Sequence, residues 1–107
     1  MGVKRTKEDI AFSKDMRARY PACQRCGASE DNGRTKQLQL CHILSRTYKA
    51  TRLDERNVVV MCSGCHFETT KDPIGFTLWL LESGLLTKED YEDLRFLAGR
   101  KPYTEYL

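Results

Sequence analysis

Five cysteines and two histidines are the residues of this 107-residue chain best suited to metal binding or proton transfer. Four of the cysteines form two C-x-x-C pairs, the first at Cys23 and Cys26 and the second at Cys62 and Cys65. A spacing of two residues lets both thiolates of a pair face one ion, and two pairs complete the tetrahedral shell of a structural zinc site. We therefore predict a structural Zn²⁺ bound by these four cysteines.

Two other interpretations of the cysteines fit the sequence less well. An odd number of cysteines without a secretory signal argues against a disulfide framework and favours a reducing, cytoplasmic location. The run Cys62-Ser-Gly-Cys65-His66 also fits the attachment pattern of c-type haem. That chemistry requires export and would leave Cys23 and Cys26 without a role, so we expect no haem. No apolar run is long enough to span a membrane, so no membrane partner is expected.

The pattern of caps, turns and apolar residues predicts a single small α+β domain over residues 1–107. Thr6 is expected to cap a helix that ends near Arg19. Alternating and β-branched apolar residues predict short strands at 38–41 and 58–61, and a short helix is expected at 66–71. Two further helices are expected in the range 73–99, separated by Gly84. The first of them is expected to bury its leucine stripe and Trp79 in the core. Its helical spacing is supplied by Ile74, Thr77, Leu78, Leu81 and Leu85, with Phe76 and Trp79 beside them.

Both histidines adjoin cysteines. His42 follows the first predicted strand and His66 follows the second cysteine pair, so a bound zinc would bring the two rings toward one point. Histidine transfers protons near neutral pH and also binds borderline metal ions. Other roles stay open, because His42 could be a hydrogen-bonded interior residue. His66 could be a neighbour of the zinc, or a zinc ligand in place of Cys65.

The order Leu40-Cys41-His42-Ile43, followed by Asn57 and then Cys62-Ser-Gly-Cys65-His66, resembles the HNH endonucleases, and more narrowly their zinc-knuckle members. The resemblance runs from Cys23 to His66. It implies a ββα-metal (His-Me finger) core at about 38–71, stapled by the zinc site and flanked by an N-terminal helix and two C-terminal helices at about 73–99. The implied activity is hydrolysis of DNA phosphodiester bonds with a divalent cation.

The resemblance also implies a role for three residues. His42 would be the general base that takes a proton from the attacking water, and His66 would bind the catalytic cation. Asn57 would hold the loop and orient the His42 ring, although an asparagine before a strand also suits a simple turn. The sequence slightly favours a monomer without deciding the oligomeric state. One active site cuts one strand, so a monomer should nick duplex DNA.

The sequence departs from the commonest family pattern at Cys41, where many members have an aspartate as the second cation ligand. A thiolate suits magnesium poorly. Cys41 is therefore either a buried apolar residue, with Asp54, Glu55 or Glu68 supplying a carboxylate, or a ligand of a softer cation, or the sign of a crippled site. With His66 as a nitrogen ligand, we expect Mn²⁺ rather than Mg²⁺.

A basic segment follows the first cysteine pair and surrounds the expected base. Residues 34–52 contain five basic side chains and no acidic one, namely Arg34, Lys36, Arg46, Lys49 and Arg52. Such a surface attracts phosphate backbones, and the planar guanidinium of Arg46 suits the reacting phosphate. Nothing in the segment is suited to reading base edges, so we expect DNA binding with low sequence specificity. A plain solvated loop is the simpler alternative.

Two rival functions keep the zinc site. A non-catalytic zinc-ribbon module would bind nucleic acid through the basic segment and use both histidines structurally. A protein-interaction module would instead present its acidic C-terminal helices to a partner. The two rivals differ from the nuclease in predicting no cleavage of DNA.

Overall fold

The computed structural model describes residues 5–106, which form an α+β fold of four helices and a two-stranded antiparallel sheet. In chain order the elements are α1 (Lys7–Arg19), β1 (Gln39–His42), η1 (Glu55–Asn57), β2 (Val58–Met61), α2 (Ser63–Lys71), α3 (Pro73–Ser83), α4 (Lys88–Leu97) and η2 (Tyr103–Tyr106). No helix in this part of the chain is both long and apolar enough to cross a membrane. The expected α+β class is confirmed.

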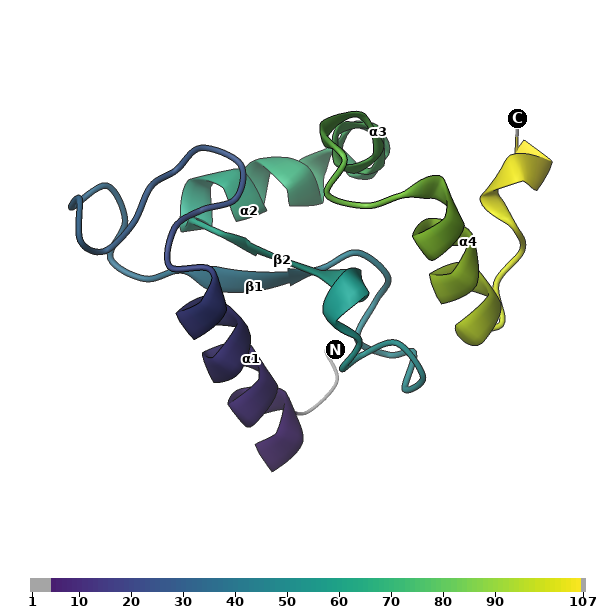
Figure 1. Cartoon of the computed structure of the whole chain (residues 1–107), viewed down its shortest axis with the longest axis horizontal. Coiled ribbons are helices and arrows are strands. Elements are labelled where there is room, and N and C mark those ends of the chain that lie inside the picture. The colour runs from purple at the N-terminus through teal and green to yellow at the C-terminus, as the bar shows by residue number, and fades with distance from the viewer. Residues whose placement is uncertain (1–4, 107) are drawn as a thin grey trace.

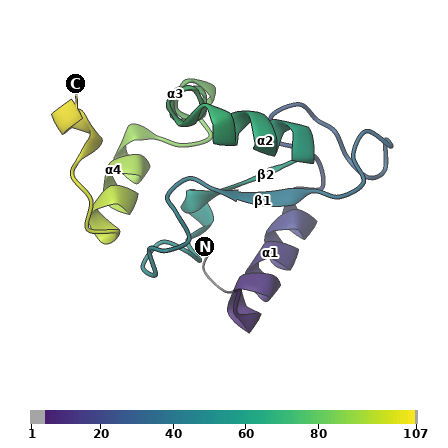
Figure 2. The same ribbon diagram turned by 180° about the vertical axis from the view of Figure 1, so that it is seen from behind.

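The hairpin of β1 and β2 is the centre of the fold. Gln39 pairs with Met61 and His42 pairs with Val58, so the register places His42 next to the end of the loop that joins the strands. Helices α1 and α2 lie on opposite sides of the hairpin (Figures 1 and 2). All four residues of β2 are therefore buried, as its continuous apolar sequence requires.

The helix ends follow local capping chemistry. At α1 the Thr6 side chain accepts a hydrogen bond from the Asp9 amide at 3.1 Å, and the Asp9 carboxylate accepts one from the Thr6 amide at 2.8 Å. Pro73 begins α3, and Gly84 ends it with a φ of 80°, a left-handed conformation that suits glycine. The predicted positions of these helices are confirmed. Strand β1 begins and ends one residue later than predicted, and α2 begins three residues earlier.

The predicted buried stripe of α3 is wrong at Leu78 and Leu85, whereas Leu81 and Trp79 pack against the core as predicted. Ile74 and Leu78 are 76% and 53% exposed, and Leu85, just beyond the helix, is 45% exposed. Phe76 and Leu80 are buried instead, with Trp79 packed beside them. The helix is apolar on most of its circumference, so several stripes fit a 3.6-residue period and the sequence does not choose among them. Contact with α2 decides which stripe is buried.

The packing of α4 predicts a large difference between two of its apolar residues. Leu94 is fully buried, whereas Phe96 is 78% exposed. We expect Leu94→Ala to lower the free energy of unfolding by about 2–5 kcal/mol, because it leaves a cavity in the core. The control Phe96→Ala should change it by less than about 0.5 kcal/mol. Urea unfolding followed by circular dichroism measures both, and equal losses would contradict this packing.

Candidate metal centre and active-site cleft

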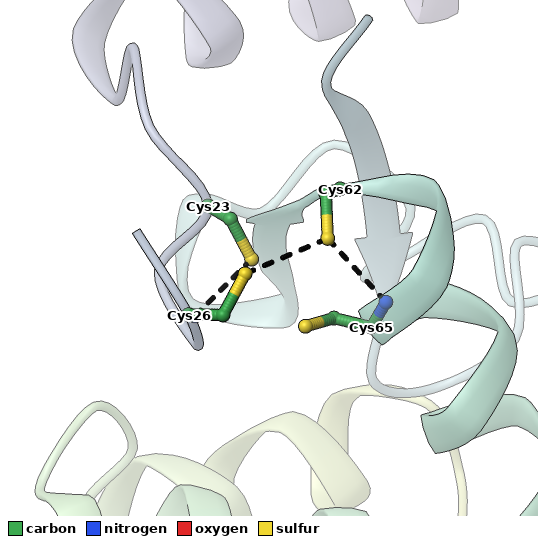
Figure 3. Close-up of side chains that lie close together, drawn as sticks. All are labelled: Cys23, Cys26, Cys62 and Cys65. Carbon is green, nitrogen blue, oxygen red and sulfur yellow. Dashed lines mark hydrogen bonds between the residues drawn. The ribbon is translucent and has the colours of Figure 1, made fainter. Parts of the chain in front are cut away.

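Four cysteine side chains from two distant segments meet at one place (Figure 3). Cys23 and Cys26 come from the turn between α1 and β1, and Cys62 and Cys65 come from the first turn of α2. All four sulfur atoms lie within 4.8 Å of one another, and the Sγ atoms of Cys26 and Cys62 are 3.7 Å apart. This spacing and donor set fit a tetrahedral Zn²⁺ site. The cluster therefore supports the predicted structural zinc.

The surroundings of the cluster favour the ionised form of Cys23 and the protonated form of Cys65. Burial opposes ionisation of Cys23, but backbone N–H groups, chiefly of Cys62 and Cys26, outweigh burial and lower the pKa of the Cys23 thiol to about 6. Burial, assisted by the neighbouring thiols, raises the pKa of Cys65 to about 12. Four thiolates this close repel one another, so a cation is needed to hold all of them ionised.

The first cysteine pair is also attached to the hairpin by Gln24, which lies between the two cysteines. The Gln24 amide donates to the Val60 carbonyl at 2.9 Å, and the Val60 amide donates to Gln24 Oε1 at 2.8 Å. The turn is closed by a hydrogen bond from the Cys23 amide to the Ala28 carbonyl at 2.7 Å. The turn that carries Cys23 and Cys26 thus lies along β2, and the cysteine cluster links this turn to the start of α2.

A cleft of about 690 Å³ opens on the α1 side of the hairpin. Its lining combines residues of α1, β1, the loop after β1 and α2 with residues just before α1 and β1. The two histidines line the same cleft, together with Arg46 and Asp9. The expectation that the folded chain brings His42 and His66 together at one site therefore agrees with the geometry.

His42 is held by one of its two ring nitrogens. Its Nε2 lies 2.9 Å from the backbone carbonyl oxygen of Arg52. A carbonyl only accepts hydrogen bonds, so Nε2 carries the hydrogen and Nδ1 is the basic nitrogen. Burial lowers the pKa of His42 below its ordinary value of 6.5, against the opposing effect of the Arg52 carbonyl. The ring is therefore neutral at pH 7 and able to accept a proton.

Asn57 closes the loop that carries Arg52. It is fully buried, and its side chain makes three hydrogen bonds across the loop. The Leu44 amide donates to Oδ1 at 2.8 Å, while Nδ2 donates to the carbonyls of Leu44 at 3.1 Å and Thr51 at 3.0 Å. Asn57 thus sets the path of the chain immediately before the carbonyl that holds His42. A residue that only formed a turn would not need these three hydrogen bonds across the loop.

His66 lies half-buried on the first turn of α2. Its Nδ1 is 2.8 Å from Oε1 of Gln39, the first residue of β1. An amide oxygen accepts, so Nδ1 carries the hydrogen and Nε2 keeps a lone pair. Burial lowers the pKa of His66, which favours the neutral ring. A histidine held in this way by a hydrogen bond has the usual arrangement of a metal ligand.

Cys41 faces away from this cleft. It is buried, and burial raises the pKa of its thiol to about 11, with Thr69 of α2 as its hydrogen-bonding neighbour. It does not line the cleft, and neither do Asp54, Glu55 or Glu68. Each of those carboxylates is ion-paired with an arginine, namely Arg56, Arg19 and Arg25 respectively. The packing therefore favours the interpretation of Cys41 as a buried thiol, without a carboxylate supplied by these three residues.

The residues of the predicted basic surface lie in different places. Arg46 lines the cleft. The Arg52 side chain is 17% exposed and ion-paired, so it is directed into the protein. Arg34, Lys36 and Lys49 are exposed but lie outside the cleft lining. The Arg34 guanidinium donates to the Cys26 carbonyl at 3.3 Å.

Sequence reasoning missed the contribution of α1 to the cleft. Asp9 and Ser13 are buried there, and Phe12 and Arg17 also line the cleft. From the sequence Asp9 has no evident role beyond the acidic first turn of the helix that Thr6 caps. The one available signal was that Asp9, Ser13 and Met16 share a helix face, which is unusual for a face that packs on a sheet because two of its three residues are polar.

The cysteine cluster predicts the metal content of the protein. Purified protein should contain about one equivalent of Zn²⁺ by elemental analysis, and its removal with a chelator should unfold the chain because binding energy contributes to folding. Cys62→Ser should lose the metal. Cys41→Ser, a matched change outside the cluster, should keep it. A folded protein without metal would contradict the zinc site.

The buried asparagine predicts a second, independent loss of stability. Asn57→Ala should lower the free energy of unfolding by about 2–4 kcal/mol, because it leaves the buried Thr51 carbonyl and the partly buried Leu44 amide without their partners. Asn32 is the control: it is exposed and makes three comparable hydrogen bonds, but water can replace them. Asn32→Ala should cost less than about 1 kcal/mol. Denaturant unfolding distinguishes the two, and similar losses would argue against the loop-closing role.

Comparisons with known proteins do not place this chain in a family. No protein-family model, curated protein or solved structure matches it. Any function assigned to the chain therefore rests on the cysteine cluster and on the residues of the cleft.

Proposed function

We propose that this protein is a divalent-metal-dependent DNA endonuclease of the HNH kind, with His42 as its general base. In this proposal β1, β2 and α2 form the ββα-metal core, and the four-cysteine cluster is its structural zinc site. The observation that carries the proposal is the environment of His42: a neutral ring, held at Nε2 by the Arg52 carbonyl, in a cleft that it shares with His66 and Arg46.

The proposed base has the properties that proton transfer requires. A ring with its hydrogen on Nε2 has its lone pair on Nδ1, and its lowered pKa keeps that lone pair free at neutral pH. Nδ1 takes a proton from a water molecule as the water oxygen bonds to the phosphorus of the scissile phosphate. The bond from phosphorus to the 3′ oxygen breaks, and the leaving 3′ oxygen takes a proton from solvent water, which gives 5′-phosphate and 3′-hydroxyl ends. Asn57 and the Arg52 carbonyl keep the ring in place during this step.

Arg46 is the proposed phosphate-binding residue. Its side chain lines the cleft and is 29% exposed, and its buried Nη2 atom lies 3.7 Å from Oδ2 of Asp9. An arginine carries five N–H donors, so the guanidinium can pair with Asp9 and still donate to a phosphate oxygen in the cleft. The exposed Arg34, Lys36 and Lys49 would contact phosphates farther along the backbone, which gives affinity without base recognition.

A catalytic cation would be held in the cleft by His66. Within residues 5–106 the four cysteines are the sole group of three or more histidine, cysteine or acidic side chains placed to hold a metal. The cleft itself offers Nε2 of His66 as one ligand, and water and phosphate oxygens would complete the shell. A bound cation would supply Lewis-acid stabilisation of the charge that develops on the phosphate. A nitrogen ligand favours Mn²⁺ over Mg²⁺.

A non-catalytic zinc-ribbon module that binds nucleic acid is the alternative. It is favoured by the absence of a second metal-binding cluster among the described residues and by the exposed basic side chains that follow the Cys23 and Cys26 turn. It does not account for the fixed ring of His42 or for the presence of Arg46 in the same cleft. The two functions differ in whether bound DNA is cut.

Nicking of supercoiled plasmid tests the proposal. The protein should convert the plasmid to open circles with Mn²⁺, more slowly with Mg²⁺ and not at all in EDTA. We expect His42→Ala to slow nicking by about 10²- to 10⁴-fold, the usual contribution of a general base. The variant should still contain zinc and still bind plasmid in a gel-shift assay.

Lys88→Ala serves as the control for this experiment, because Lys88 is exposed on α4 and does not line the cleft. It should nick at the wild-type rate. Binding of plasmid without nicking under any cation would overturn the nuclease and support the zinc-ribbon module. Nicking that survives in His42→Ala would exclude His42 as the base.

A further inference from the structure

Asp9 is a buried carboxylate to which neither the fold nor the proposed chemistry has yet given a role in the cleft. It is 6% exposed and lies in the first turn of α1. Its Oδ1 is 3.0 Å from Nε of Arg52, and its Oδ2 is 3.7 Å from Nη2 of Arg46. Both arginines come from the loop between the strands, so Asp9 joins α1 to that loop.

The Arg52 residue connects this carboxylate to the proposed base. Its side chain is ion-paired with Asp9, and its backbone carbonyl accepts the hydrogen bond from Nε2 of His42 at 2.9 Å. The second partner of Asp9, Arg46, is the proposed phosphate-binding residue. One carboxylate therefore contacts both of the loop residues on which the cleft depends.

Helix capping alone does not require the burial of Asp9, as a comparison within the chain shows. The tetrapeptide Thr-Lys-Glu-Asp occurs twice, at residues 6–9 and at 87–90, and in both places it begins a helix. The side chain of Asp90 is 44% exposed, whereas that of Asp9 is 5% exposed. Asp90 pairs with Arg56 at 3.3 Å, and α4 begins with the Thr87 side chain as its cap, so this tetrapeptide starts a helix without a buried carboxylate. Burying a carboxylate is unfavourable unless charged partners surround it.

We propose that Asp9 is a positioning residue of the nuclease cleft, which holds Arg46 toward the phosphate and fixes His42 through the backbone of Arg52. This inference rests on the proposed nuclease function. It makes α1 a part of the active unit, although α1 lies outside the segment that resembles the HNH family. The negative charge of Asp9 also offsets part of the positive charge of the two arginines.

The two effects of Asp9 have opposite consequences for substrate binding and turnover. Without the carboxylate, the arginines are no longer held, and misplaced groups lower the rate of the chemical step. The cleft also becomes more positive, which strengthens attraction to DNA phosphates. Loss of Asp9 should therefore lower kcat while KM stays the same or falls. A residue that only supported the fold would not produce this combination.

The test compares Asp9→Asn with Asp90→Asn, which is the same change in the same tetrapeptide. With Mn²⁺, Asp9→Asn should lower kcat for plasmid nicking by about 10- to 100-fold, with KM unchanged or lower. Asp90→Asn should leave both at wild-type values. Asp9→Glu keeps the charge and should recover most of kcat. Rates are normalised to the zinc-containing, folded fraction, so a partly unfolded variant does not mimic the effect.

A second readout does not depend on nuclease activity. The chain has only two histidines, so ¹⁵N-detected NMR of the imidazole rings resolves each one, with His66→Ala for assignment. Asp9→Asn should change the ring nitrogen signals of His42 and leave those of His66 as in the wild type. If Asp9→Asn does not fold, Arg52→Gln removes the same ion pair from the other side and should give the same change at His42.

The outcomes separate the two proposals. A changed His42 spectrum in a protein whose wild type does not nick DNA would overturn the nuclease but keep the positioning role of Asp9. Wild-type kcat and an unchanged His42 spectrum in Asp9→Asn would overturn the positioning role alone. An equal fall in kcat in Asp90→Asn, or a raised KM with unchanged kcat in Asp9→Asn, would also overturn it.

Discussion

The meeting of four cysteine sulfurs is the constraint on which the rest of this small structure depends. A chain of 107 residues buries a limited core, and its only sheet has two strands among the residues described. A two-stranded hairpin is marginally stable without further support. The cluster supplies that support by joining the turn after α1 to the start of α2, with the hairpin between them. Zinc binding at such a cluster adds directly to the free energy of folding.

The cleft depends in turn on how the ends of the hairpin are held. The register places His42 opposite Val58, immediately beside Asn57, whose side chain closes the long loop between the strands. His66 lies one residue after the cluster, on the first turn of α2. His42 is therefore next to the buried side-chain amide of Asn57, and His66 is next to the cysteine cluster. A site built in this way is organised before any ligand binds.

Much of this arrangement could be read from local sequence, because its signals act over a few residues. The cysteine spacing predicted the cluster, and Thr6, Pro73 and Gly84 marked helix ends through capping chemistry that needs no distant partner. The β-branched run Val58–Met61 predicted the buried strand with its correct bounds. The strand-end position of His42 and the position of His66 after the second pair also predicted that both would reach the same cleft.

Contacts between distant segments determined the remainder. Identical Thr-Lys-Glu-Asp sequences give different carboxylates, because Asp9 is buried against Arg46 and Arg52 whereas Asp90 pairs with Arg56 and stays 44% exposed. Cys41 points toward α2 because neighbouring residues of a strand face opposite sides, and the register decides which side. The buried stripe of α3 was chosen by its contact with α2. Local patterns specify where elements begin and end, whereas the surroundings of a side chain depend on packing partners that are remote in sequence.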